Sequence, residues 1–239
     1  MLKRCVLSVL LILVFLIFSC TTVYASKTAY GFKTTDLSED EIKEIWQYIN
    51  VRSSVDSVSL NDIGAPIVSF DISDDGEILL GFEGNEFAVV DEMGVVNLYE
   101  FTNDGIFYVK WNDDNILLLL VRGSIVVEID TDGQLVNMIK ADESSSHNNS
   151  LWNYISRKKC ISQGEYSYCV RNDMGLFNFF TSSYSQLIKT DSNGNTTVIY
   201  DISDAIIAKS ILLLFCVVIL IAVVVKSVVI ESEKYKKSH

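Results

Sequence analysis

Two long apolar runs lie at opposite ends of this chain and decide where the residues between them can fold. One run covers Cys5–Ser19 and the other covers Ile206–Val225. The C-terminal run has no charge between Lys209 and Lys226, and at about 1.5 Å per residue it covers about 30 Å if Lys209 reaches back to the interface. That length crosses a bilayer. We therefore expect a transmembrane helix over residues 206–226.

The N-terminal run predicts a signal peptide of residues 1–25. It follows two basic residues and ends at Val23-Tyr24-Ala25, which has small or aliphatic residues at the positions that a signal peptidase reads. Two other interpretations are open. The stretch from Ile17 to Cys20 resembles a bacterial lipobox, whose cysteine is acylated, although Phe18 departs from that pattern. A retained run would instead form a second span.

The positive charges predict the orientation of the chain in the membrane. They lie before the N-terminal run and after the C-terminal run, at Lys3, Arg4, Lys226, Lys234, Lys236 and Lys237. Such charges stay on the cytoplasmic side. We expect a single-pass protein of the cell membrane, with residues 26–205 outside and a cytoplasmic tail of residues 227–239.

The segment between the two runs is strongly acidic. Residues 26–205 hold 12 Lys and Arg residues against 29 Asp and Glu residues, a net charge of −17, whereas the whole chain carries −12. An acidic domain repels nucleic acid and anionic lipid headgroups, and it favours cations, cationic peptides or simple solubility. We expect no nucleic-acid partner.

The cysteines predict one disulfide. Cys5 and Cys20 belong to the signal region and Cys216 to the span, so Cys160 and Cys169 are the pair in the exported segment. In an oxidising compartment such a pair forms a disulfide bond. The spacing matches neither a redox motif nor a zinc site.

An internal repeat indicates the architecture of the exported segment. At an offset of 39 residues, Asp74-Asp75, Gly84 and Asp91–Gly94 correspond to Asp113-Asp114, Gly123 and Asp130–Gly133. A third copy has matching turns at Asn172–Gly175 and Asp191–Gly194. Asp and Gly are turn residues, because Asp accepts backbone hydrogen bonds and Gly adopts positive φ. The repeats cover residues 66–103, 105–142 and 164–202.

Short apolar stretches between these turns predict four strands in each repeat. In the first repeat they are Ile67–Ile72, Ile78–Phe82, Phe87–Val90 and Val95–Phe101. Repeated four-stranded units of this length resemble the blades of a β-propeller, although the Gly-His and Trp-Asp signatures of the WD family are absent. The resemblance implies a mainly β fold, a partial or open propeller of three antiparallel blades, within residues 66–205.

Three blades leave open sheet edges, which need a cover or a partner. Residues 26–65 offer one cover. They contain a predicted helix that begins at Ser38, with Glu41 at capping-box spacing and apolar residues on one face, and a predicted lead-in strand at Val55–Leu60. Dimerisation or docking of another subunit is the alternative.

An insertion at residues 143–163 separates the second and third repeats and is the first place to expect binding. Its candidate binding residues are Trp152, Tyr154, Arg157, Lys158 and Lys159. Loops on a rigid scaffold carry binding sites, and the predicted disulfide ties this one down. The alternative is a polar excursion with solvated basic residues, in which Trp152 and Tyr154 pack against the third blade.

Catalytic and metal sites are not predicted, and neither is a cofactor. His147 lies in a Ser/Asn tract that does not provide the rigid placement of a catalytic triad. Asp130 with Asp132, and Asp191 with Asn193, offer too few oxygens for the six to eight ligands of calcium.

The sequence therefore predicts a membrane-anchored, non-enzymatic module that contacts another membrane or surface protein, or a second copy of itself. The alternative is a sensor or receptor subunit for a small molecule or glycan. Its binding residues would be the aromatic side chains Trp152, Phe177, Phe179 and Tyr184.

Overall fold

The computed structural model describes residues 28–54, 59–91 and 94–238. The predicted signal peptide and Cys20 lie outside these residues. So does most of the predicted strand at Val55–Leu60. A strand is present just before it, at Arg52–Ser54, and Leu60 instead begins a short helix.

The described strands form three antiparallel sheets, which we call blades 1, 2 and 3. Blade 1 has the order β3-β7-β6-β5-β4. Its strands are β3 (Arg52–Ser54), β4 (Ile67–Ile72), β5 (Ile78–Phe82), β6 (Glu86–Asp91) and β7 (Gly94–Glu100). The four strands predicted for the first repeat are confirmed to within a residue at their ends.

Blade 2 has the order β1-β2-β11-β10-β9-β8, so the N-terminal segment extends its outer edge. Its strands are β1 (Thr28–Ala29), β2 (Phe32–Thr35), β8 (Phe107–Asn112), β9 (Asn115–Leu120), β10 (Ile125–Ile129) and β11 (Leu135–Ala141). Strand β2 pairs with the end of β11 through Thr34 and Thr35.

Blade 3 has the order β12-β13-β14-β15 and differs in detail from the predicted third repeat. Its strands are β12 (Cys160–Gln163), β13 (Tyr166–Arg171), β14 (Gln186–Thr190) and β15 (Thr196–Asp201). The first strand, β12, lies in the segment predicted as an insertion. The turn at Asn172–Gly175 follows the second strand, whereas the repeat pattern predicted it after the first. Asp, Asn and Gly are common in turns after any strand, so they do not show which strand a turn follows. It leads into a 3₁₀ helix, η1 (Gly175–Phe180).

The helices are α2 (Glu39–Ile49), α3 (Leu60–Ile63), α4 (Ser146–Ser156) and α5 (Ser203–Ser238). The predicted capping box of α2 is confirmed, since Ser38 and Glu41 exchange both of its hydrogen bonds. The apolar face of α2 packs against the core that blades 1 and 2 share, through Ile42, Ile45 and Trp46.

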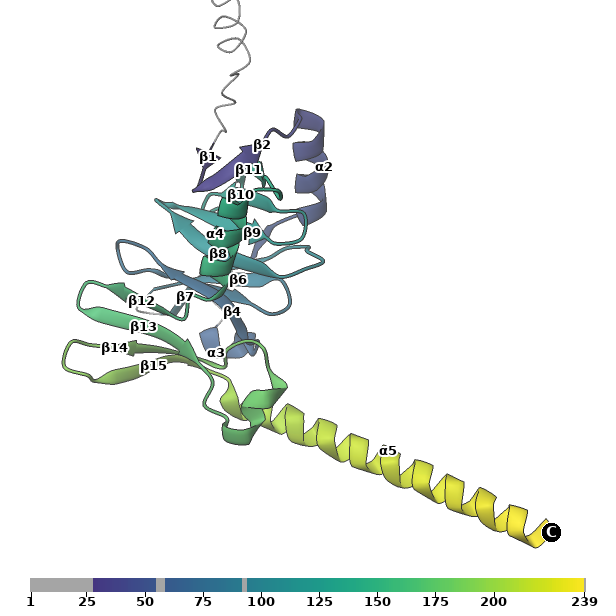
Figure 1. Cartoon of the computed structure of the whole chain (residues 1–239). Helices are drawn as coiled ribbons and strands as arrows, with labels where there is room; N and C mark the ends of the chain where they lie inside the picture. Colours follow the sequence, from purple (N-terminus) through teal and green to yellow (C-terminus); the bar gives the residue numbers. More distant parts are fainter. Residues whose placement is uncertain (1–27, 55–58, 92–93, 239) are drawn as a thin grey trace, which may run out of the picture.

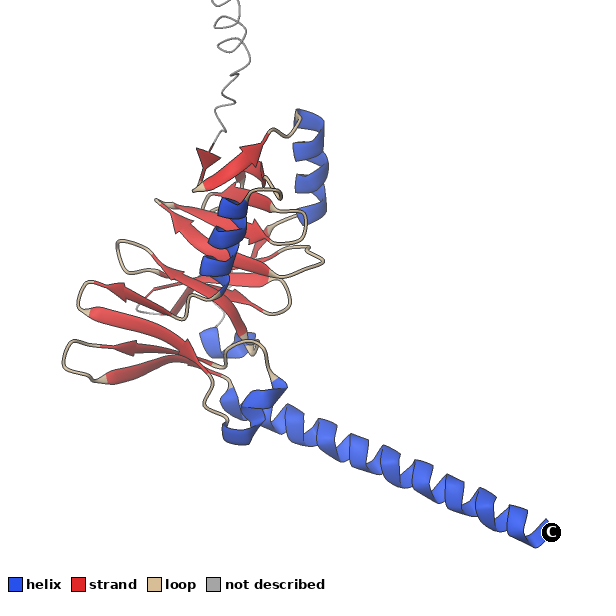
Figure 2. Ribbon diagram, in the orientation of Figure 1, coloured by secondary structure: helices blue, strands red, loops and turns tan. Residues whose placement is uncertain are grey.

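Blade 1 lies between the other two blades, as Figures 1 and 2 show. Leu79 and Leu80 are neighbours on β5 and both are fully buried. Leu79 packs into the core shared with blade 2, and Leu80 packs into the core shared with blade 3. A strand that is buried on both faces needs a continuous apolar run, which explains why β5 has no polar alternation.

The spatial order of the blades is therefore 2-1-3, whereas their order in the chain is 1-2-3. Helix α4 carries the chain from blade 2 along the side of the stack toward blade 3 (Figure 1). In a closed ring of blades the last blade lies beside the first, and blade 3 takes that place here. The fold is mainly β and propeller-like, as predicted, with three blades among the described residues.

Helix α5 begins inside the domain and then leaves it. Ile202 and Ile206 are buried in the core of blades 1 and 3, whereas the apolar side chains from Ile211 to Val225 are largely exposed. The segment Ser203–Lys226 has a mean hydropathy of 3.0 over its most apolar window. Its 24 residues extend about 36 Å. The predicted helix of spanning length and composition is confirmed.

Truncating either leucine at the centre of blade 1 should destabilise the whole stack. We expect Leu79→Ala and Leu80→Ala each to lower the free energy of unfolding by about 2–5 kcal/mol, because each leaves a cavity in one of two tightly packed cores. Val136→Ala on β11 is the control, since Val136 is half exposed, and it should change stability by about 0.5 kcal/mol or less. Urea unfolding in detergent measures all three. If only one of the two leucine variants lowered the free energy of unfolding, the result would contradict a blade that is packed on both faces.

Candidate functional site

The insertion that was expected to bind a partner folds as helix α4 and covers blade 2. Ser145 caps the helix by accepting a hydrogen bond from the Asn148 amide. Leu151, Trp152 and Ile155 then face the outer side of blade 2, where they pack against a small core that includes Phe32. The helix therefore shields an apolar sheet face that would otherwise lie in water.

Asn148 holds α4 to the edge of blade 2. Its side chain is 1% exposed. Its amide oxygen accepts from the Lys33 N–H at 2.8 Å, and its amide nitrogen donates to the carbonyls of Lys33 and Asp142 at 2.8 and 2.9 Å. The side chain thus pairs with β2 as another strand would. His147 also contacts this edge, with Nε2 2.8 Å from the Gly31 carbonyl oxygen.

The five predicted binding residues do not form one site. The Trp152 ring lies against Phe32, with 4.8 Å between ring centroids, so it belongs to the packed side of α4. The alternative that placed Trp152 and Tyr154 against blade 3 is wrong for both. Tyr154 is 68% exposed. Arg157 ends the helix and is exposed.

The two lysines that follow have separate partners. Lys158 Nζ lies 3.0 Å from Asp71 Oδ1 on β4, and Lys159 Nζ lies 5.7 Å from the centroid of the Tyr184 ring. The expectation of a solvated basic cluster is therefore wrong for Lys158. It joins the end of α4 to blade 1 instead.

Asp71 and Ser69 bind the inner strands of blades 1 and 2 together. Ser69 Oγ accepts from the Val109 N–H at 2.9 Å, and Asp71 Oδ2 accepts from the Trp111 N–H at 3.0 Å. These amides lie two residues apart on β8, and the two side chains lie two residues apart on β4. Side-chain oxygens thus satisfy one edge of β8 in place of a further strand. The approach is close, since a Cβ at Gly81 on β5 would lie 3.2 Å from the Phe107 ring and 3.4 Å from Val109 Cγ1, both on β8.

A small cavity lies where these groups meet α4. The residues that line it include Ser69, Asp71, Lys110, Tyr154 and Lys158. Its volume is about 70 Å³, whereas sites for drug-sized ligands have about 300–1,000 Å³. A cavity of this size has room for a few water molecules or one small polar group. Both Asp71 oxygens are already engaged, so the cluster joins elements rather than presenting a free carboxylate.

A second buried carboxylate, Glu128 on β10, lies under the N-terminal segment. Tyr30 donates to its Oε2 at 2.6 Å, and Asn112 and Asn115 donate to its Oε1 at 2.8 and 3.1 Å. Burial raises the pKa of Glu128, but these three hydrogen bonds to the charged form outweigh it and leave the pKa below its usual value. Burial and the bond to Glu128 raise the pKa of Tyr30 to about 12.

The predicted disulfide is confirmed. Cys160 and Cys169 face each other on β12 and β13, with 4.2 Å between their Cα atoms.

The acidic turns also act as predicted for turns. Asp130 and Asp191 each accept two backbone amides of their own hairpin through Oδ1. Within the described part of the chain, no three His, Cys, Asp or Glu side chains gather closely enough to hold a metal ion.

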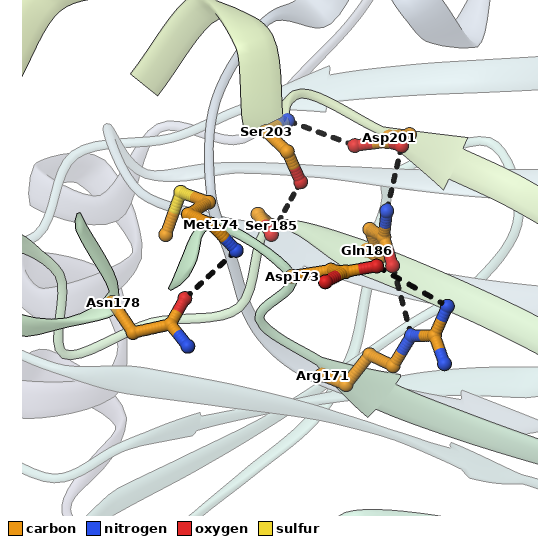
Figure 3. A network of polar contacts seen from close by, with 8 residues as sticks. All are labelled: Arg171, Asp173, Met174, Asn178, Ser185, Gln186, Asp201 and Ser203. Atoms are coloured by element: carbon orange, nitrogen blue, oxygen red, sulfur yellow. Dashed lines mark hydrogen bonds and ion pairs between the residues drawn. The ribbon is translucent and has the colours of Figure 1, made fainter. Parts of the chain in front are cut away.

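The outer face of blade 3 carries a chain of polar contacts that reaches α5 (Figure 3). Arg171 Nε donates to Gln186 Oε1 at 2.9 Å, and Gln186 Nε2 donates to Asp201 Oδ2 at 2.6 Å. Asp201 Oδ1 accepts from the Ser203 amide at 2.8 Å. Burial raises the pKa of Asp201, but the bonds from Ser203 and Gln186, with the Arg171 charge, bring it below its usual value. This face is therefore polar, unlike the apolar face of blade 2 that α4 covers.

The outer edge of blade 3 is different from the corresponding edges of the other blades. The last blade strand β7 pairs with β3 in blade 1, and β11 pairs with β2 in blade 2. In blade 3 the last strand is β15, and no strand in the described ranges pairs with its outer edge. Sequence reasoning missed this difference, because the covering strands come from a distant part of the chain.

Comparisons with known proteins place the chain in no family. No family model and no curated protein matches it. Among solved structures, it is similar to a catalytically inactive variant of virginiamycin B lyase from Staphylococcus aureus with quinupristin, at 10% identity and a TM-score of 0.30 over 62% of this chain and 45% of that one. It is also similar to a protein of unknown function from Bacteroides caccae, at 14% identity and a TM-score of 0.28 over 57% of this chain and 49% of that one. The chain thus spans about half the length of these proteins, and the fold class rests on its own sheets.

Removing the cation that faces Asp71 should weaken the stack. We expect Lys158→Met to lower the free energy of unfolding by about 1.5–3 kcal/mol, since it leaves a nearly buried carboxylate oxygen without its charged partner. Lys159→Met is the matched control and should cost about 1 kcal/mol or less, because it removes only an exposed contact with Tyr184. Urea unfolding in detergent compares the two. Equal losses would mean that Lys158 is a surface residue after all.

The Glu128 cluster should make stability depend on pH. A carboxylate whose pKa is lowered in the folded state stabilises the fold above its unfolded pKa of about 4.5. That contribution is lost as the pH falls through the lower, folded-state pKa. We expect Glu128→Gln to cost about 1–3 kcal/mol at pH near 7 and to cost progressively less below pH of about 4.5.

The control for this change is Glu143→Gln, which alters the net charge equally at an exposed site outside the cluster. Urea unfolding across the acid range gives both curves. A cost for Glu128→Gln that stays constant as the pH falls would show that the cluster does not depend on the carboxylate charge.

Proposed function

We propose that this chain is a membrane-anchored, extracytoplasmic interaction module that contacts another membrane or surface protein. The apolar helix α5 supports anchoring, and the disulfide supports an oxidising compartment. In this proposal residues 1–25 are a signal peptide, residues 26–205 lie outside, residues 206–226 cross the bilayer and residues 227–239 are cytoplasmic. The module acts by binding rather than by catalysis.

The outer edge of β15, with which no described strand pairs, is the observation that carries this proposal. Residues Thr196 to Ile199 are β-branched, and the strand contains neither Lys nor Pro, which commonly protect exposed edges. The protective features that the strand has are the bulge near Ile199 and the charge of Asp201 at its end. An edge of this kind accepts an extended segment of another protein as a further strand.

The register of the hairpin identifies the backbone groups that are available. Asp191 N–H bonds to the Asn195 carbonyl, and bonded and non-bonded pairs alternate along an antiparallel ladder. The pair Lys189 and Thr197 is therefore bonded. It follows that Thr196 and Val198 turn their N–H and C=O groups away from β14, toward a partner.

The position of β15 favours a partner in the same membrane. The strand ends at Asp201 and α5 begins at Ser203, so almost no linker separates the edge from the span. A neighbouring membrane protein reaches this edge with a short juxtamembrane segment. The net charge of −17 on residues 26–205 favours a segment with basic flanks.

The alternative of a small-molecule or glycan sensor has less support. Its four aromatic residues do not converge. Trp152 packs on Phe32, Tyr184 lies under Lys159, Phe177 borders the core of blades 1 and 3, and Phe179 is exposed. The cavity under α4 is also too small for a sugar ring with its contacts.

A proline on the open edge should abolish partner binding without unfolding the domain. We expect Val198→Pro to remove an outward N–H and to leave the ladder to β14 intact, since edge strands tolerate proline where the N–H faces solvent. Val198→Thr is the matched control, because it keeps the N–H and a β-branched side chain. A photoreactive residue at Thr196 of the full-length chain, in its native membrane, should form a crosslink in the control and lose it in the proline variant.

Thermal unfolding of both variants shows whether the domain is intact. Equal crosslinking by Val198→Pro and Val198→Thr would contradict strand addition at β15. A crosslinked product of two copies of this chain would show that the edge pairs with itself rather than with a different protein.

A further inference from the structure

The 3₁₀ helix η1 exposes two large apolar side chains at one end of the domain. Leu176 is 94% exposed and Phe179 is 88% exposed, whereas Met174 is 4% exposed and Phe177 borders the core of blades 1 and 3. Asn178 holds the turn by accepting a hydrogen bond from the Met174 amide at 3.0 Å (Figure 3). The segment is therefore anchored on one side and presents leucine and phenylalanine on the other.

This helix lies beside the first turns of α5. It is the short green helix next to the start of α5 in Figure 1, and the two elements are in contact. Ile206 and Ser210 on α5 are still buried, at 9% and 6% exposed, while the apolar side chains from Ile211 onward are largely exposed. Helix η1 therefore projects from the domain beside the turns of α5 at which α5 leaves the domain.

We propose that η1 inserts Leu176 and Phe179 into the interfacial layer of the bilayer beside α5. This rests on the proposed function only in that α5 crosses the membrane. The charge-free part of the span begins after Lys209, so the headgroup layer surrounds the turns of α5 that η1 accompanies. Apolar side chains of short segments enter this boundary between headgroups and acyl chains.

The bilayer fits this surface better than a protein partner does. Helix η1 contacts α5, whose apolar side chains are exposed from Ile211 onward, and lipid is the environment that surrounds that part of α5. The acidic domain repels anionic headgroups, so the contact depends on apolar insertion and persists at high salt. With two contact points, α5 and η1, the blade stack has one orientation on the membrane.

Site-directed spin labelling of the full-length chain tests this inference. A nitroxide is placed at Leu176→Cys or at Phe179→Cys, with Cys5, Cys20 and Cys216 replaced by Ala and the disulfide left intact. The protein is reconstituted in nanodiscs of phosphatidylcholine and phosphatidylglycerol in equal parts. Collisions of the label with oxygen, which dissolves in lipid, and with a water-soluble nickel chelate report its surroundings.

We expect both labels to lose nickel collisions and to keep oxygen collisions, also in high salt. A label at Val136→Cys provides the aqueous control, because Val136 is half exposed on β11, and β11 lies at the opposite end of the stack from α5 in Figure 1. A label on the native Cys216 tests the span itself. If Cys216 reports lipid while positions 176 and 179 resemble position 136, the inference is overturned and the anchor stands. If Cys216 also reports water, the proposed anchoring fails as well.

Discussion

Apolar sheet faces must be removed from water, and every feature of this domain follows from how three stacked sheets achieve that. Blade 1 buries Leu79 on one side and Leu80 on the other. A closed ring covers all remaining faces with further blades, but a stack of three leaves two outer faces. The outer faces of blades 2 and 3 differ in how they meet water. Helix α4 covers blade 2, whereas blade 3 ends in the polar chain of Arg171, Gln186 and Asp201. With the faces covered in these two ways, the outer edge of β15 is the place where we propose that another protein adds.

Several elements that local sequence determines were predicted, whereas those that depend on distant contacts were not. The capping box of α2 and the strands of blade 1 follow from short-range patterns. The disulfide followed by elimination among five cysteines. The order of the blades in space leaves no local pattern, because blade 3 packs on the far side of blade 1 and not on its neighbour in the chain.

The candidate site shows the same limit at the level of single residues. Asn148 looked like part of a polar loop, yet it bonds to Lys33 across more than a hundred residues of sequence. The spacing of Leu151, Trp152 and Ile155 is helical and was the available signal for α4. The sequence predicts one basic cluster after it, but a run of charge in sequence does not show which side chain faces a buried carboxylate. The two lysines differ because Asp71 on β4 lies within reach of Lys158 and forms an ion pair with it.

The junction between domain and helix links the fold to the proposed binding edge. Ile202 and Ile206 belong to the same core as Leu80, and Asp201 bonds to the first amide of α5. A flexible linker would let the edge of β15 face any direction, whereas a helix that begins inside the core holds it at one angle. Insertion of Leu176 and Phe179 into the interface would restrain the remaining rotation about α5. A strand edge held in this way meets a partner segment with little orientational entropy left to lose, which favours binding between two proteins confined to the same bilayer.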